Sequence, residues 1–168
     1  AEARLLADRG ARRKAAGLYR EALAWLRAGP DDPALDASVR LQMARLFIDD
    51  GRHVEAEDEL RHAERLAITH NLVHHLVQVY AAMGSVRGQQ LDDAGFVFFE
   101  QAIQLVPMVG RSPILEAELY YEYGAFMTRV GRPAEARAHL DRARELFESV
   151  GASSALRRVE TALIQVPA

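Results

Sequence analysis

The hydrophobic and polar positions of the chain follow a helical period along most of its length. In four segments a small residue, a bulky apolar residue and a second small residue are spaced four and then three positions apart, which places them on one face of an α-helix. Successive first members lie 41, 39 and 41 residues apart. The pattern predicts four copies of one unit, in which small residues let a neighbouring helix pack closely. The sets are Ala15, Tyr19 and Ala22; Ala56, Leu60 and Ala63; Gly95, Phe99 and Ala102; and Ala136, Leu140 and Ala143.

A second amphipathic segment precedes each of these helices, so the predicted unit is a pair consisting of a leading and a trailing helix. Asp32 and Ser112 each stand before a proline suited to a first helical turn, and Gly10, Gly51 and Gly131 are expected to break the chain between paired helices. The first copy keeps only the end of its leading helix. The expected packing positions of the others are Arg40, Met43, Ala44 and Phe47; Val73, Leu76, Val77 and Tyr80; and Tyr120, Tyr123, Gly124 and Met127.

These units predict a single all-α domain over residues 1–168. The segment "SVRGQQ", residues 85–90, has no counterpart in this assignment and is expected to lengthen a helix or form a loop. Gly151 is expected to end the last pair and Ser153 or Ser154 to cap a further helix, which would cover the packing face of the last repeat. The expected repeats span about 1–29, 33–69, 71–106 and 113–149, with the capping helix at 153–165.

Composition narrows the class of function. Twenty-one basic and 24 acidic residues give a net charge of −3, without a long basic run, so nucleic acid and membrane surfaces are disfavoured partners. The absence of cysteine excludes disulfides and thiolate sites. No apolar stretch approaches the length of a membrane-spanning helix, and we expect a cytoplasmic protein. Because the chain begins with Ala1 in a helical pattern, it is expected to be a fragment of a longer protein.

The repeated small residues and the intervening glycines resemble the tetratricopeptide repeat family over nearly the whole chain. That family has a usual period of 34 residues, whereas this period is near 40. Longer periods are common in the sensor arrays of bacterial LuxR-type and maltose-activator-type regulators, which the chain resembles less specifically. The resemblance implies a right-handed superhelix of about four antiparallel helix pairs plus an end helix. It also implies a concave face, lined by the leading helices, that binds a protein or peptide.

Counting along the leading helices away from the packed positions gives the expected partner-binding residues. Arginines there could clamp carboxylates of a partner, and Tyr121 could serve as an aromatic anchor. The alternative for each residue is an ordinary solvated position on a helix. The set comprises Arg4, Asp8, Leu41, Arg45, Asp49, Asn71, His74, Gln78, Glu118, Tyr121, Thr128 and Arg129.

Catalytic, cofactor and metal sites are not expected. The chain has no nucleophile elbow, phosphate-binding loop or dinucleotide fingerprint, and His70, His74 and His75 have no nearby acidic residue to complete a metal site. The three aromatic rings of the run "FVFF", residues 96–99, cannot lie on one helix face. We therefore expect the segment 85–90 to cover the extra phenylalanine, with a contact between copies as the alternative.

The leading hypothesis is therefore a non-catalytic protein- or peptide-binding module, serving as the sensor or assembly part of a bacterial regulator. The alternatives are a domain that senses a small molecule and a self-associating scaffold.

Overall fold

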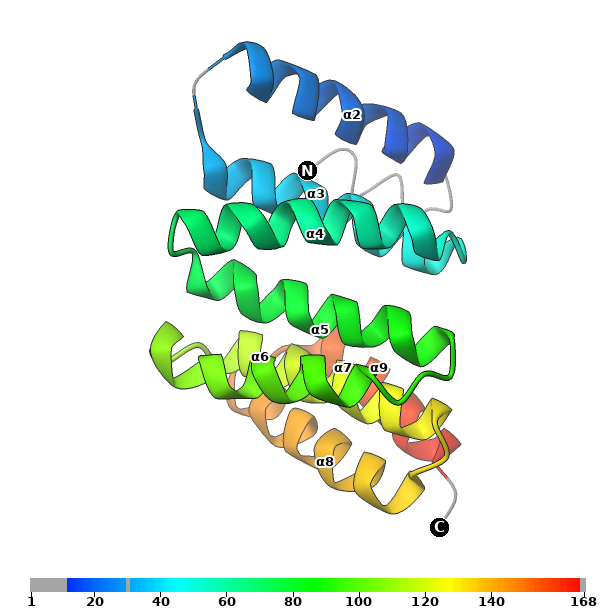
Figure 1. The fold of residues 1–168 in the computed structure, drawn as a ribbon. Helices are drawn as coiled ribbons and strands as arrows, with labels where there is room; N and C mark the ends of the chain where they lie inside the picture. The colour runs from blue at the N-terminus through cyan, green and yellow to red at the C-terminus, as the bar shows by residue number, and fades with distance from the viewer. Residues whose placement is uncertain (1–11, 30, 167–168) are drawn as a thin grey trace. The chain divides into compact units, whose positions relative to one another are not determined.

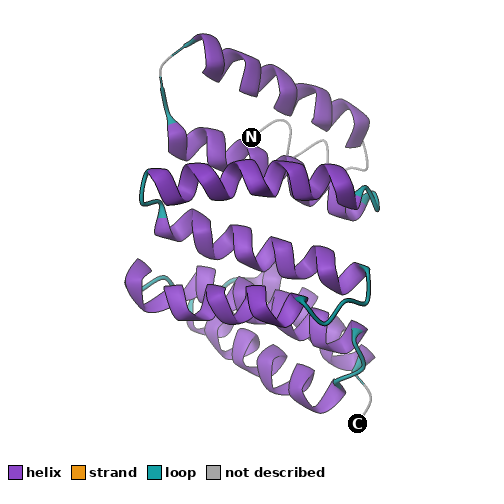
Figure 2. Ribbon diagram, viewed as in Figure 1, coloured by secondary structure: helices purple, strands orange, loops and turns teal. Residues whose placement is uncertain are grey.

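The computed structural model describes residues 12–29 and 31–166, which form eight α-helices and no strand (Figures 1 and 2). The predicted all-α class is confirmed. The helices are α2 (Arg12–Ala28), α3 (Pro33–Asp49), α4 (His53–Thr69), α5 (Val73–Gln89), α6 (Gly95–Val109), α7 (Pro113–Arg129), α8 (Pro133–Ser149) and α9 (Ser153–Gln165). Two compact units divide within α5, between Ala82 and Met83, and are called the first and second units below.

The pair α3 and α4 is the centre of the first unit. Asp32 caps α3, because its carboxylate accepts a 2.9 Å hydrogen bond from the backbone N–H of Leu35, and Pro33 follows at the first helical position. The two helices contact each other along their length, and α2 also packs against α3. As a result α3 is buried over a broad face, whereas α4 buries a single stripe that includes Ala56 and Ala63.

The pair α7 and α8 is the centre of the second unit, where α9 packs on α8 and α6 packs on α7. Gly124 brings the paired helices together: a β-carbon there would lie 2.7 Å from Cγ of Leu140. Between α6 and α7 an aromatic cluster fills the interior. In it the Phe99 ring stacks on Tyr123 with centroids 4.6 Å apart, and Phe126 lies 5.2 Å from Phe99.

The repeated small, bulky and small positions form the core, as predicted. Eleven of the twelve residues in the four sets are buried, and the exception, Ala22 of α2, is half-buried. The bulky members Leu60, Phe99 and Leu140 are fully buried. Each trailing helix therefore uses the same face for packing, and that face recurs because the spacing of the pattern is that of a helix.

The prediction of an inserted segment at residues 85–90 is wrong. Helix α5 has 17 residues, as α3 and α7 do, and it includes positions 85–89. Gly84 rather than Val77 is its close-packing position, since a β-carbon at Gly84 would lie 2.4 Å from the Phe99 ring. The packing positions proposed for this helix, Val73, Leu76, Val77 and Tyr80, stand seven residues too early. Seven residues are about two helical turns and return to the same face, so the apolar pattern fits both assignments.

Five helices end in the same left-handed turn. After α3, for example, Gly51 has φ 70° and the N–H of Arg52 donates to the carbonyl of Phe47, as in a Schellman motif. Gly131 and Gly151 end α7 and α8 in the same way, whereas Asn71 and Leu91 take this conformation without being glycine. Gly10 lies outside the described residues.

The prediction of a serine cap on α9 is wrong. The N-cap residue of α9 is Ala152, and no side chain accepts a hydrogen bond from the first turn. Ser112 occupies the N-cap position of α7 before Pro113, but its side chain makes no capping hydrogen bond either.

Candidate binding face

In the first unit the candidate binding face comprises the predicted partner-binding residues on α3 and on α5 with its preceding turn, and in the second unit it comprises those on α7. Arg4 and Asp8 lie outside the described residues. Leu41 does not belong to an accessible face, because its side chain is only 1% exposed. The reason is that α3 packs against both α2 and α4, so a position outside the repeat's packing stripe is also buried.

In the first unit the remaining members of the face lie on α3, on α5 and in the turn before α5. Arg45 is half-buried and Asp49 is exposed near the end of α3. Asn71 and His74 are exposed and Gln78 is half-buried. These side chains present polar groups of both signs, together with imidazole and amide groups that can pair with a peptide backbone.

A hydrogen bond joins the two leading helices of the first unit. The Ser38 hydroxyl on α3 and Nε2 of His75 on α5 lie 2.8 Å apart. Burial and, secondarily, neighbouring His74 hold the pKa of His75 below its usual value, so the ring is neutral at pH 7. Side chains of α3 and α5 therefore meet beside the candidate face.

Arg40, also on α3, is a buried structural cation. Its guanidinium bonds Asp36 on the same helix at 2.6 Å and Glu59 of α4 at 2.8 Å. The Arg40 side chain is 8% exposed and its two partners about one-fifth exposed. Removing both partners would leave a buried charge unpaired. The bond to Glu59 ties α3 to α4, so Arg40 has a structural role in this pair.

In the second unit Glu118 and Tyr121 of α7 hold an arginine from α9. The two terminal nitrogens of Arg158 lie 3.4 Å from the two carboxylate oxygens of Glu118, and its Cζ lies 4.6 Å from the centroid of the Tyr121 ring. The ion pair is partly exposed, and such a pair typically contributes at most about 1 kcal/mol. Two predicted face residues are therefore brought together around a cation.

The other predicted residues of α7 lie towards its carboxyl end. Thr128 is half-buried and its hydroxyl donates to the carbonyl of Gly124 at 2.9 Å, while Arg129 is exposed. Beside them, Ser85 of α5 donates a 3.4 Å hydrogen bond to Glu122. Thr128 thus satisfies its donor within the helix, which leaves its oxygen as an acceptor for a ligand.

Sequence reasoning missed the contacts that join one leading helix to the next. Ser38 and His75, and likewise Ser85 and Glu122, are 37 residues apart, and Glu118 and Arg158 are 40 residues apart. These separations are close to the repeat period. The repeat period could have predicted these contacts, because residues about one repeat apart occupy equivalent positions along successive leading helices.

The aromatic run of α6 is covered by the chain itself at two of its three rings. Phe99 is fully buried, and Phe96 lies with its edge towards Phe126 at 4.7 Å. The guanidinium of Arg132 covers the Phe96 ring, with Cζ 4.3 Å from its centroid. Intramolecular cover is therefore confirmed for these rings, but Arg132 supplies it on Phe96 where residues 85–90 were expected to. Phe98 is half-buried.

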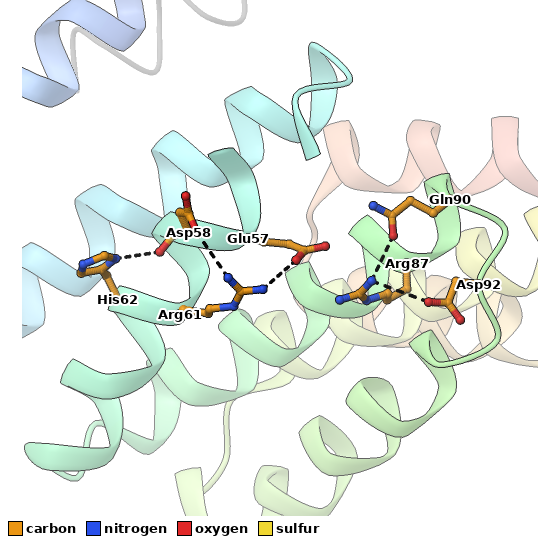
Figure 3. A network of polar contacts seen from close by, with 7 residues as sticks. All are labelled: Glu57, Asp58, Arg61, His62, Arg87, Gln90 and Asp92. Atoms are coloured by element: carbon orange, nitrogen blue, oxygen red, sulfur yellow. Dashed lines mark hydrogen bonds and ion pairs between the residues drawn. The ribbon is translucent and has the colours of Figure 1, made fainter. Parts of the chain in front are cut away.

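The trailing helix α4 carries a solvated network of charges (Figure 3). Arg61 bonds Glu57 at 3.0 Å and Asp58 at 3.3 Å, all within α4. In the second unit, Arg87 at the end of α5 bonds Gln90 at 3.1 Å. These are short-range pairs on exposed surfaces, where charge contributes little to stability and suits water better than a ligand.

No metal site is formed by the described residues. Among residues 12–29 and 31–166, no three histidine, cysteine, aspartate or glutamate side chains gather closely enough to hold an ion. The rings of His74 and His75 stand 6.0 Å apart and edge to face, and His75 is bonded to Ser38. His75 thus makes a polar contact within the protein, whereas His74 is exposed.

Comparison of the sequence with family models and curated proteins does not assign the chain to a family. The sequence matches no family model, and no curated protein shows significant similarity to it. In the described part of the chain, each helix is too short or too polar to cross a membrane.

Proposed function

We propose that the chain is a tetratricopeptide-like module that binds a segment of a partner protein along its leading helices. The observation that carries this proposal is that the leading and the trailing helix of each pair make different kinds of contact. Trailing helices bury a repeated small and bulky stripe, and most of their ion pairs are short-range, such as those of Arg61 with Glu57 and Asp58. Leading helices instead bring polar and aromatic side chains of successive helices together, as Ser38 does with His75 and Glu118 does with Arg158.

The chemistry of this face suits a polypeptide. His74 and Gln78 offer groups that pair with backbone amides and carbonyls, Arg45 and Arg129 offer cations for carboxylates, and Tyr121 offers a half-buried ring of the kind that anchors interfaces. The module would serve as the sensor or assembly part of a larger regulatory protein.

The proposal is tested by measuring the binding of a random heptapeptide display library, followed by titration of the selected peptides. We expect His74→Ala and Tyr121→Ala to weaken binding at least about fivefold, as the loss of interface anchors does. Arg61→Ala on α4 and Arg142→Ala on α8 are matched controls on trailing helices and should leave binding unchanged.

Two results would contradict the proposal. One is equal loss of binding in the leading-helix and trailing-helix variants. The other is a library that yields no binder, while a screen of sugars and other metabolites raises the unfolding temperature. That second outcome would favour a domain that senses a small molecule.

A further inference from the structure

The side chains of Glu118 and Tyr121 form a receptor for a guanidinium group. They are three residues apart on α7 and so share a helix face. The carboxylate of Glu118 faces both terminal nitrogens of Arg158, and the ring of Tyr121 lies under its Cζ. We propose that this is an arginine-binding site, which Arg158 fills in the free protein and an arginine of the partner polypeptide takes over on binding. The inference rests on the proposed function and names the partner's chemistry.

The geometry selects arginine over other cations. A carboxylate that faces two nitrogens matches the planar fork of a guanidinium, which an ammonium lacks. The Tyr121 ring adds a flat surface on which that plane can lie, and arginine stacks on aromatic faces more often than lysine does. The site thus reads both the charge and the planarity of its occupant.

Arg158 is held loosely enough to be replaced. Both of its contacts with Glu118 are 3.4 Å long, whereas tight charge-assisted bonds measure about 2.8 Å. Its side chain is 52% exposed. Arg40 of the first unit shows the contrast, since its bonds of 2.6 and 2.8 Å join an almost fully buried side chain to its partners.

The helix that carries Arg158 is also lightly anchored. Only Ala155 and Val159 are buried along α9, whereas seven residues are buried along α7. Beyond the helix, Val166 is buried and its carbonyl accepts a 3.2 Å bond from Arg137. Helices with few buried apolar contacts open most readily in native proteins, so α9 can shift enough to release Arg158.

The experiment uses two synthetic peptide libraries that differ only at a central residue, which is arginine in one and citrulline in the other. Citrulline keeps the planar shape of arginine without its charge. Arg158 competes with the arginine of a peptide for the site. The apparent affinity for the peptide is therefore the intrinsic affinity multiplied by the fraction of time that Arg158 leaves the site empty. Because a partly exposed ion pair of this kind is weak, Arg158→Ala should bind the arginine library up to about fivefold more tightly than the wild type.

Arg142→Ala is the matched control, because Arg142 also pairs with α7, through Glu116 at 3.3 Å, and its loss changes the net charge equally. This control should not gain affinity. Adding Glu118→Gln to Arg158→Ala should abolish the gain. If removing Arg158 unfolds α9, Arg158→Lys provides the test instead: it keeps the charge, loses the fork, and should give a smaller gain.

The outcomes separate the two proposals. Preference for the arginine library that rises in Arg158→Ala and not in Arg142→Ala supports the site. Binding of both libraries with equal affinity by every variant would overturn the arginine site and leave the proposed function standing. Failure of all variants to bind either library would overturn both.

Discussion

At the scale of single residues, the pair α7 and α8 depends on a missing side chain. A β-carbon at Gly124 would lie 2.7 Å from Cγ and 2.9 Å from Cδ2 of Leu140, and 3.1 Å from the carbonyl oxygen of Ala136. Because that oxygen belongs to the backbone, it cannot swing away as a side chain can. Gly17 of α2 is different, since nothing lies within 4 Å of the position of its absent β-carbon.

We therefore expect Gly124→Ala and Gly17→Ala to change stability in opposite directions. Overpacking at Gly124 should lower the free energy of unfolding by about 1–3 kcal/mol. Alanine at Gly17 should raise it by about 0.5–1 kcal/mol, because a helical glycine costs that much relative to alanine. Urea denaturation measures both values. A stabilised Gly124→Ala protein would show that α7 and α8 are not in close contact at this point.

Leu91 predicts a second effect at residue scale. It has φ 55° in the turn after α5 and is 69% exposed, so it has a strained backbone with little burial in return. Left-handed backbone costs a residue with a side chain roughly 1–2 kcal/mol. Leu91→Gly should accordingly raise the midpoint of thermal unfolding, whereas Gly131→Leu, at the equivalent turn after α7, should lower it. Lower midpoints in both variants would mean that Leu91 makes a stabilising contact.

At the scale of elements, a histidine couples the packing of α7 and α8 to pH. His139 of α8 lies against the rings of Tyr120 and Tyr123, with centroids 5.6 and 4.5 Å away. Burial lowers the pKa of His139, although the nearby Glu135 opposes this shift. His75 of α5 also has a pKa lowered by burial. Both imidazoles are therefore harder to protonate in the folded than in the unfolded chain.

The sign of the resulting pH dependence follows from this difference. Below the usual histidine pKa of 6.5, the unfolded chain binds protons that the folded chain does not. The free energy of unfolding therefore decreases as the pH is lowered, until the histidines of the folded chain become protonated as well. We expect His139→Gln to reduce this loss of stability between pH 7.5 and 5.5, measured by urea denaturation. The same replacement at the exposed His62 is the control. Parallel curves for wild type and His139→Gln would contradict a half-buried His139 with a lowered pKa.

The elements also show how far the sequence determines the fold. Pro33 and Pro113 begin α3 and α7 as predicted, because the ring of proline fits only the first turn of a helix. The small residues at Ala63 and Ala143 are buried because close helix packing requires them. The third repeat was misassigned because a shift of seven residues preserves the helix face. Leu41 was predicted to lie on an accessible surface, because the sequence of one helix does not reveal that a second neighbouring helix buries it.

Contacts of the candidate face were less predictable than its residues. The helical period placed Glu118 and Tyr121 on an outward face of α7, and both are partly accessible. The approach of Arg158 depends on how α9 packs on its neighbours, which a pattern local to either helix does not contain. Arg158 and Glu118 are 40 residues apart, which is close to the repeat period, and this separation would have indicated that they pair.

At the scale of the whole molecule, the account depends on the leading helices, and not the trailing helices, contacting the ligand. Nuclear magnetic resonance titration with the tightest peptide from the random library tests this most directly. We predict that the largest shifts of backbone amide signals occur on leading helices, around Arg45 and His74 in the first unit or around Tyr121 in the second, with small shifts on α4 and α8. Shifts concentrated on α4 and α8 would contradict binding along the leading helices.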